Sequence, residues 1–176
     1  MRNFDFYILQ NSSMKKAAIF ILILFTKCFA GLQAQQVEIM KFDALQQILS
    51  SNNDTTYVIN FWATWCKPCV HELPAFDTAF TKYANKPVKI ILVSLDFKRE
   101  YETRLVKFVN EHKTLPLVVL LDEPDYNKWI DKVAKEWGGA IPATMVFNNK
   151  NHFRYFHEDE LTFPDLCKRI DEGLTK

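Results

Sequence analysis

Cys66 and Cys69 are separated by two residues in the stretch WCKPC, residues 65–69, and this spacing suits three kinds of chemistry. The pair could bind a metal ion, form a static disulfide, or open and close in thiol–disulfide exchange. A structural zinc site needs four ligands, usually a second cysteine pair or two suitably spaced histidines, and the sequence offers neither. A disulfide that closes so short a loop constrains the unfolded chain little. Exchange is therefore the favoured interpretation, and no metal or cofactor is expected.

Thiol–disulfide exchange needs one accessible thiolate and a second thiol near enough to resolve the mixed disulfide. Residues 56–63 form an apolar run typical of a buried strand, and residues 66–84 have the pattern of a helix with Pro68 in its first turn. Cys66 would then begin the helix, where free N–H groups and the helix dipole lower a thiol pKa from about 8.5 to roughly 3.5–7.5. Cys69 is expected one turn further along, more buried, and second to attack.

The remaining chain alternates strand and helix patterns around this pair. Strands are expected at residues 37–40, 88–96, 115–122, 143–148 and 152–157, and helices at 42–51, 101–112, 124–137 and 163–174. This alternation predicts an α/β fold, a three-layer sandwich with a central sheet flanked by helices. The last two strands are spaced as an antiparallel hairpin, which makes the sheet mixed.

The first 34 residues predict a signal peptide. Lys15 and Lys16 precede nine apolar residues, 17–25, which is too short a run to span a bilayer comfortably, since a spanning helix needs about 20. A basic patch, a short apolar core and a small residue, here Ala34, form the usual three-part export pattern. Cleavage is therefore expected near Ala34.

A single domain of residues 35–176 is expected to follow, in the periplasm or another extracytoplasmic part of a bacterial envelope, where a close cysteine pair can form a disulfide. The alternative is that residues 17–34 anchor the chain in the inner membrane. Residues 1–13 suit no export role, so Met14 is an alternative start. The chain has 22 basic and 21 acidic residues, and this near-neutral balance gives no reason to expect nucleic acid as a partner.

The stretch NFWATWCKPCVHELPAF, residues 60–76, resembles the active-site segment of the thioredoxin-fold family, specifically the exported TlpA-like and ResA-like thiol-disulfide oxidoreductases. The resemblance covers about residues 37–174 and implies a thioredoxin-like fold. Residues 122–138 resemble the helical insertion of the TlpA-like group.

The resemblance also implies a substrate surface. GAIPAT, residues 139–144, matches the cis-proline loop of the family, so Pro142 is expected in cis after Ile141, against the disulfide, with backbone offered to a substrate chain. An ordinary turn proline is the alternative. Trp65, Lys67 and Pro68 are expected to complete this surface.

A buried carboxylate is the last feature that the resemblance implies. Thioredoxins carry an Asp six residues before the first cysteine, where this chain has Asn60, which cannot titrate. The exported relatives instead place a Glu three residues after the second cysteine, and Glu72 matches that position. Because Glu72 lies one helical turn from Cys69, its carboxylate could accept the Cys69 proton. The alternative is an ordinary solvent-facing glutamate.

These features predict that Cys66 attacks a disulfide in a client protein and that Cys69 resolves it with Glu72 as proton acceptor. Lys67 favours the thiolate, so a reductase-leaning potential between about −270 and −180 mV is predicted. The expected partners are client proteins with disulfides and an unidentified electron donor of the membrane or envelope, and the chain is expected to be a monomer. One alternative is a redoxin-type peroxidase, although Thr64 is wrongly spaced from Cys66 for its Thr-x-x-Cys motif. Another is a non-enzymatic client-binding module with an idle disulfide.

Overall fold

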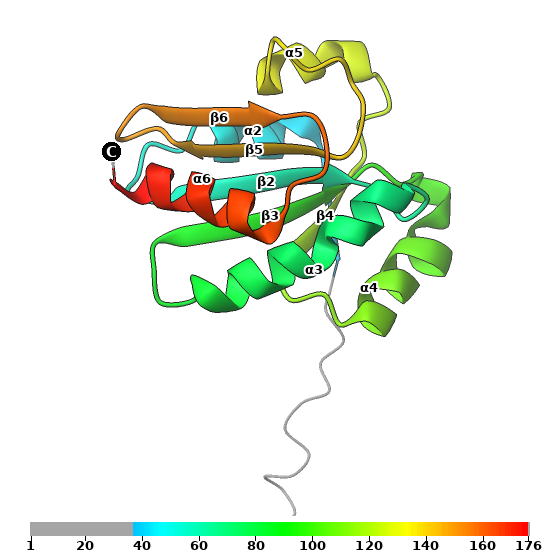
Figure 1. Ribbon diagram of the computed structural model, residues 1–176. Helices are drawn as coiled ribbons and strands as arrows, with labels where there is room; N and C mark the ends of the chain where they lie inside the picture. The colour runs from blue at the N-terminus through cyan, green and yellow to red at the C-terminus, as the bar shows by residue number, and fades with distance from the viewer. Residues whose placement is uncertain (1–36, 176) are drawn as a thin grey trace, which may run out of the picture. The chain divides into compact units, whose positions relative to one another are not determined.

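Six strands form one mixed sheet in the computed structural model, which describes residues 37–175 (Figure 1). They are β1 (Glu38–Met40), β2 (Thr56–Trp62), β3 (Val88–Ser94), β4 (Leu117–Leu121), β5 (Ala143–Asn148) and β6 (Phe153–His157). Their order across the sheet is β1-β4-β3-β2-β5-β6. The first four strands of this order are parallel, whereas β5 is antiparallel to both β2 and β6. The mixed sheet expected from the sequence is confirmed.

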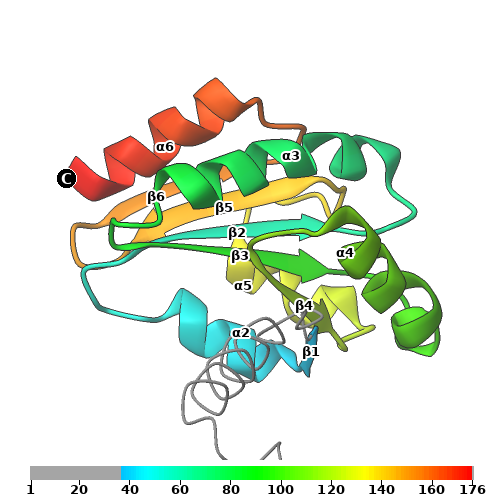
Figure 2. The ribbon, with the colours of Figure 1, turned by 90° about the horizontal axis from the view of Figure 1, so that it is seen from below.

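Helices cover both faces of the sheet, which gives the predicted three layers (Figure 2). They are α2 (Phe42–Leu49), α3 (Lys67–Lys82), α4 (Lys107–His112), α5 (Ile130–Val133) and α6 (Phe163–Thr175). One apolar cluster joins the sheet to α3, α4 and α6, and a second joins the opposite face to α2 and α5. The sheet is therefore packed on both sides, as in thioredoxin-like proteins.

Strand β2 lies between β3 and β5 and is buried along its whole length. Because successive side chains of a strand point to opposite faces, Ile59 and Phe61 enter the cluster with α2, while Val58 and Trp62 enter the cluster with α3. Asn60 shares the face of Val58 and Trp62, so β2 brings one buried amide toward α3. This double burial explains the nearly unbroken apolar run of the strand.

The predicted helix over 101–112 forms in two parts, a π-helix at Tyr101–Val106 followed directly by α4. Leu105 and Val109 are buried. Phe108 is half-buried, and its ring centroid lies 5.4 Å from that of Trp62.

The continuous helix predicted over 124–137 is wrong. A 3-10 turn at Tyr126–Lys128 precedes the four-residue α5, and Ala134 is already extended. Trp129 and Trp137 are buried in the cluster with α2, and their indole N–H groups donate to the carbonyls of Glu123 (3.1 Å) and Ala140 (2.8 Å). We attribute the break to these two side chains, whose burial overrides the local helical pattern.

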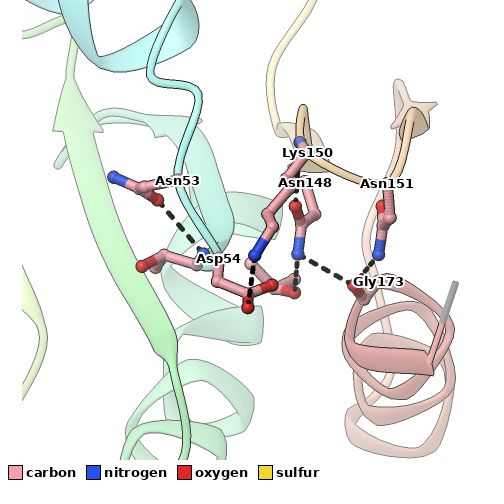
Figure 3. A network of polar contacts seen from close by, with 8 residues as sticks. Asn53, Asp54, Asn148, Lys150, Asn151 and Gly173 are labelled. Carbon is pink, nitrogen blue, oxygen red and sulfur yellow. Dashed lines mark hydrogen bonds and ion pairs between the residues drawn. The ribbon is translucent and has the colours of Figure 1, made fainter.

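A polar network joins the start of β2, the β5–β6 turn and the end of α6 (Figure 3). The Asn148 and Asn151 amides both donate to the Gly173 carbonyl, at 3.2 and 2.8 Å. A Cβ atom at Gly173 would lie 2.6 Å from Thr56 Cγ2, a distance that requires something to move. This close approach fixes α6 against the end of β2 that is remote from the cysteines.

Three predictions lie outside the described residues. They are the signal peptide at residues 1–34, the cleavage point near Ala34 and the alternative start at Met14. Within residues 37–175, none of the helices has the length and apolar character needed to cross a bilayer.

Candidate active site

The two cysteines lie just beyond the carboxyl end of β2, at the beginning of α3. Cys66 is the N-cap residue of α3, and Cys69 lies in its first turn. They form a disulfide with a Cα–Cα distance of 5.3 Å. Cys66 is 6% exposed and Cys69 is fully buried, which is the order of accessibility expected from the sequence. The Cys69 backbone N–H donates to Cys66 Sγ at 3.3 Å, so after reduction the same N–H is placed to stabilise a Cys66 thiolate.

The loop before β5 lies against this disulfide. The Ile141–Pro142 peptide bond is cis, which confirms the conformation expected of Pro142. The carbonyl oxygen of Ile141 lies 3.7 Å from Cys66 Sγ. Pro142 is buried and Ile141 is half-buried, so the loop presents backbone beside the more accessible sulfur.

Glu72 is buried beneath the site, with 4% of its surface exposed, so the solvent-facing alternative is wrong. Its Oε1 atom accepts a hydrogen bond from Asn60 Nδ2 (2.7 Å), and its Oε2 atom accepts one from the Leu161 backbone N–H (2.8 Å). Asn60 Nδ2 also donates to Thr144 Oγ1 of β5 at 3.0 Å. The Glu72 carboxyl group is thus bound by β2 and by the loop that leads into α6.

Burial raises the pKa of Glu72 from 4.5 to about 7. Desolvation is the largest cause, because a charged carboxylate loses its hydration when it is buried. The hydrogen bonds from Leu161 and Asn60 lower the pKa, while the nearby charges of Glu160 and Asp159 raise it. A carboxyl group that titrates near neutral pH can both accept and return a proton under ordinary conditions.

A groove of about 410 Å³ opens beside the reactive pair. The predicted surface residues Trp65 and Ile141 line it, and Trp65 is 49% exposed. The other lining residues, which the sequence did not single out as site residues, are Leu95, Tyr126, Asn127, Ile130, Gly138 and Gly139. Lys67 and Pro68 are exposed on the first turn of α3. The segment 124–137, which does not form the predicted continuous helix, therefore contributes Tyr126, Asn127 and Ile130 to a groove next to Cys66.

Asp96 is a buried residue of the site that the sequence did not reveal, because the charged stretch that it opens is typical of a solvated surface. Its carboxylate accepts hydrogen bonds from the Thr64 backbone N–H (3.0 Å) and from Ser94 Oγ (2.8 Å). The Thr64 hydroxyl also donates to Asp96. Asp96 thereby fixes the turn that leads from β2 to the cysteines.

His71 and Trp62 lie close to the cysteine pair in the sequence and take no part in the disulfide. His71 is exposed and lies 3.0 Å from the Glu160 carboxylate, and Trp62 is fully buried under α4. Cys167 is a buried thiol on α6, unpaired within residues 37–175.

Comparison with known proteins finds a matching family model and similar proteins. The model of the AhpC/TSA family matches residues 30–156. The chain is 29% identical over 136 residues to sporulation thiol-disulfide oxidoreductase A of Bacillus subtilis, a match that covers 77% of this chain and 79% of that protein. It is 49% identical over 111 residues to thiol-disulfide oxidoreductase ResA of Oceanobacillus iheyensis, covering 62% of this chain but only about half, 52%, of that relative.

Among solved structures, a thioredoxin-related protein from Neisseria meningitidis serogroup B superimposes with a TM-score of 0.62 at 20% identity. The match covers 73% of this chain and 91% of the other. At this identity the likeness shows a shared fold.

Proposed function

Because the chain belongs to the AhpC/TSA family, we propose that it is an exported thiol-disulfide oxidoreductase that exchanges disulfides with client proteins through Cys66 and Cys69. The observation that carries the proposal is the Cys66–Cys69 disulfide at the N-terminus of α3, with Cys66 beside the cis-proline loop and Cys69 buried. The names of the two relatives support the activity, and the export pattern of the first 34 residues supports the location.

In the proposed reaction the reduced protein acts on a client disulfide. The Cys66 thiolate attacks one client sulfur, so a Cys66–client disulfide forms, and the other client sulfur leaves and takes a proton from water. Cys69 then gives its proton to Glu72 and attacks Cys66 Sγ. The Cys66–Cys69 bond forms as the second client sulfur leaves and is protonated. Two electrons have passed to the client, and an envelope electron donor must restore the thiols.

The direction of exchange is proposed to be reductive. Lys67 adds a cation directly after Cys66 in the chain, and the Cys69 N–H group is available to the thiolate, so the reduced form is favoured electrostatically. Equilibration with glutathione measures the potential, which we place between about −270 and −180 mV. A value near −120 mV, typical of a strong oxidant, would contradict the reductive assignment.

The arrangement around Cys66 does not favour the peroxidase alternative. A redoxin-type peroxidase needs a threonine hydroxyl at its reactive thiol, whereas the hydroxyl of Thr64 donates to Asp96. Peroxide consumption coupled to a thiol reductant separates the two activities. Failure to catalyse insulin reduction by dithiothreitol would favour the client-binding module with an idle disulfide.

The proposed order of attack is tested by trapping. In a Cys167→Ser background, Cys69→Ala should accumulate stable mixed disulfides with envelope proteins, seen as thiol-sensitive adducts on non-reducing gels. Cys66→Ala in the same background is the matched control and should trap none. If the control traps clients and Cys69→Ala does not, the roles of the two cysteines are reversed.

A further inference from the structure

Glu158, at the end of β6, binds the loop that precedes the cis-proline. Its Oε2 atom accepts the Gly138 N–H at 2.9 Å, and its Oε1 atom accepts the Ala140 N–H at 2.8 Å. Both oxygens of one half-buried carboxylate are therefore engaged by the amides on either side of Gly139. Hydrogen bonds to an ionised acceptor are among the stronger ones in proteins.

The loop has few other features that would hold it in place. Gly138, Gly139 and Ala140 are exposed and belong to no helix or strand. Gly139 has a φ of +92°, a conformation that glycine adopts readily but other residues do not. The Ala140 carbonyl accepts the Trp137 indole N–H at 2.8 Å, so the Ala140 residue is bound through both of its main-chain polar groups. A flexible glycine pair is thereby held in one conformation.

The same loop carries the backbone next to the reactive sulfur. Ile141 follows Ala140 directly, and its carbonyl oxygen lies 3.7 Å from Cys66 Sγ. Gly138, Gly139 and Ile141 also form one wall of the 410 Å³ groove. A shift of this loop would move both the groove wall and the backbone beside Cys66.

We propose that Glu158 is a positioning residue that presents the 138–141 backbone to the client polypeptide. The inference rests on the proposed function, because it needs a client that binds at this loop. The hydrogen bonds of Glu158 go to the loop backbone and not to either cysteine. Its removal should weaken client binding and leave the intrinsic reactivity of the Cys66 thiol unchanged. A residue that acts only as a structural brace would lower stability without this selectivity.

Two substitutions and one control test the inference. Glu158→Gln keeps the side-chain length but retains one acceptor oxygen, so one of the two loop amides loses its partner, and Glu158→Ala removes both acceptors. Glu136→Gln is the matched control, since Glu136 is exposed, lies two residues before Gly138 and makes the same change of charge. Each variant is assayed for reduction of fluorescently labelled insulin and for alkylation of the reduced protein by iodoacetamide.

We expect KM for insulin to rise about tenfold in Glu158→Ala and less in Glu158→Gln. The loss of a hydrogen bond to a charged group has an effect of this order. The rate of iodoacetamide alkylation and kcat should remain within twofold of the wild type, and Glu136→Gln should match the wild type throughout. Amide hydrogen exchange should become faster at both Gly138 and Ala140 in Glu158→Ala, and at one of these two amides in Glu158→Gln. This exchange reports on the loop independently of activity.

The outcomes distinguish this inference from the proposed function. A wild-type protein that does not reduce insulin would overturn the proposed function itself. An active wild type with an unchanged KM in Glu158→Ala would overturn the positioning role, as would equal losses in insulin reduction and in alkylation. Unchanged exchange at Gly138 and Ala140 would show that the carboxylate does not hold the loop, and would also refute the inference.

Discussion

Replacement of Glu72 by glutamine should make the oxidised protein more stable above neutral pH. The wild-type carboxyl group has its pKa raised from 4.5 to about 7 by burial. A raised pKa means that the folded state binds the proton more tightly than the unfolded state. The stability associated with the protonated group is therefore fully present below pH 4.5 and is lost as the pH rises through about 7. At 1.36 kcal/mol for each pKa unit, the loss amounts to about 3 kcal/mol.

Glutamine avoids this loss because it does not ionise, and the surroundings of Glu72 can accommodate an amide. Asn60 Oδ1 is buried and has no hydrogen-bond partner among the described residues. If the Asn60 amide turns over, its oxygen can accept from the new side-chain NH₂ group. In the wild type the Leu161 N–H donates to Glu72, and in the variant the oxygen of the glutamine amide can accept the same hydrogen bond. The substitution should therefore leave few buried polar groups unsatisfied.

Urea unfolding of the oxidised wild type and of Glu72→Gln at several pH values measures the effect, with the disulfide intact so that neither Cys66 nor Cys69 titrates. The Cys167 thiol is common to both proteins and cancels in the comparison. The two proteins should be similar at pH 4. The variant should gain about 3 kcal/mol relative to the wild type by pH 9, a midpoint shift of roughly 1–3 M urea. Glu111→Gln, an exposed carboxylate 3.9 Å from Lys107, is the control and should show little pH-dependent difference. A difference between Glu72→Gln and wild type that does not vary with pH would refute the reasoning.

Three further predictions concern Glu72, Gly173 and Asp96. The rate at which Cys69 resolves a Cys66-linked mixed disulfide should rise through a pH of about 7 and should be at least about tenfold slower in Glu72→Gln at pH 8. Rapid-quench measurements showing equal rates would remove Glu72 from the mechanism. Gly173→Ala should lower the free energy of unfolding by about 1–3 kcal/mol, because the new methyl group meets Thr56, and an unchanged urea midpoint would contradict this packing. Asp96→Ala should destabilise by about 1–3 kcal/mol because the Thr64 N–H and the Ser94 hydroxyl lose their acceptor, and Asp96→Asn, which keeps one acceptor, should lose less.

The sequence predicted most of the sheet and its main helices because their patterns are local. The buried run over residues 56–63, the helix that begins at Cys66 and the hairpin over 143–157 each follow from the period of their apolar residues, and the structure has β2, α3, β5 and β6 at these places. The cis bond before Pro142 followed from a motif rather than from a physical signal in the residues around it. Its presence is confirmed.

The features that the sequence did not predict depend on contacts between distant residues. Asp96 opens a charged stretch and looks solvated, and only the fold places it against Thr64, 32 residues earlier. Glu158 meets Gly138 and Ala140 across 20 and 18 residues, and nothing local distinguishes it from its exposed acidic neighbours. The buried Trp129 and Trp137 gave one usable signal, since two tryptophans in a short polar segment indicate burial rather than a surface helix.

The titration of Glu72 near neutral pH results from two opposed effects that come from different parts of the fold. Burial on α3 raises the pKa, and the two donors, Asn60 on β2 and the Leu161 N–H, lower it. An apolar residue at position 60 would remove one donor and raise the pKa further, so the carboxyl group would hold its proton at neutral pH and could no longer accept one from Cys69. An aspartate at that position would instead place two carboxyl groups in contact, and one of them would then stay protonated. An uncharged hydrogen-bond donor on the strand is therefore the choice that keeps the Glu72 carboxyl group able to exchange protons at neutral pH.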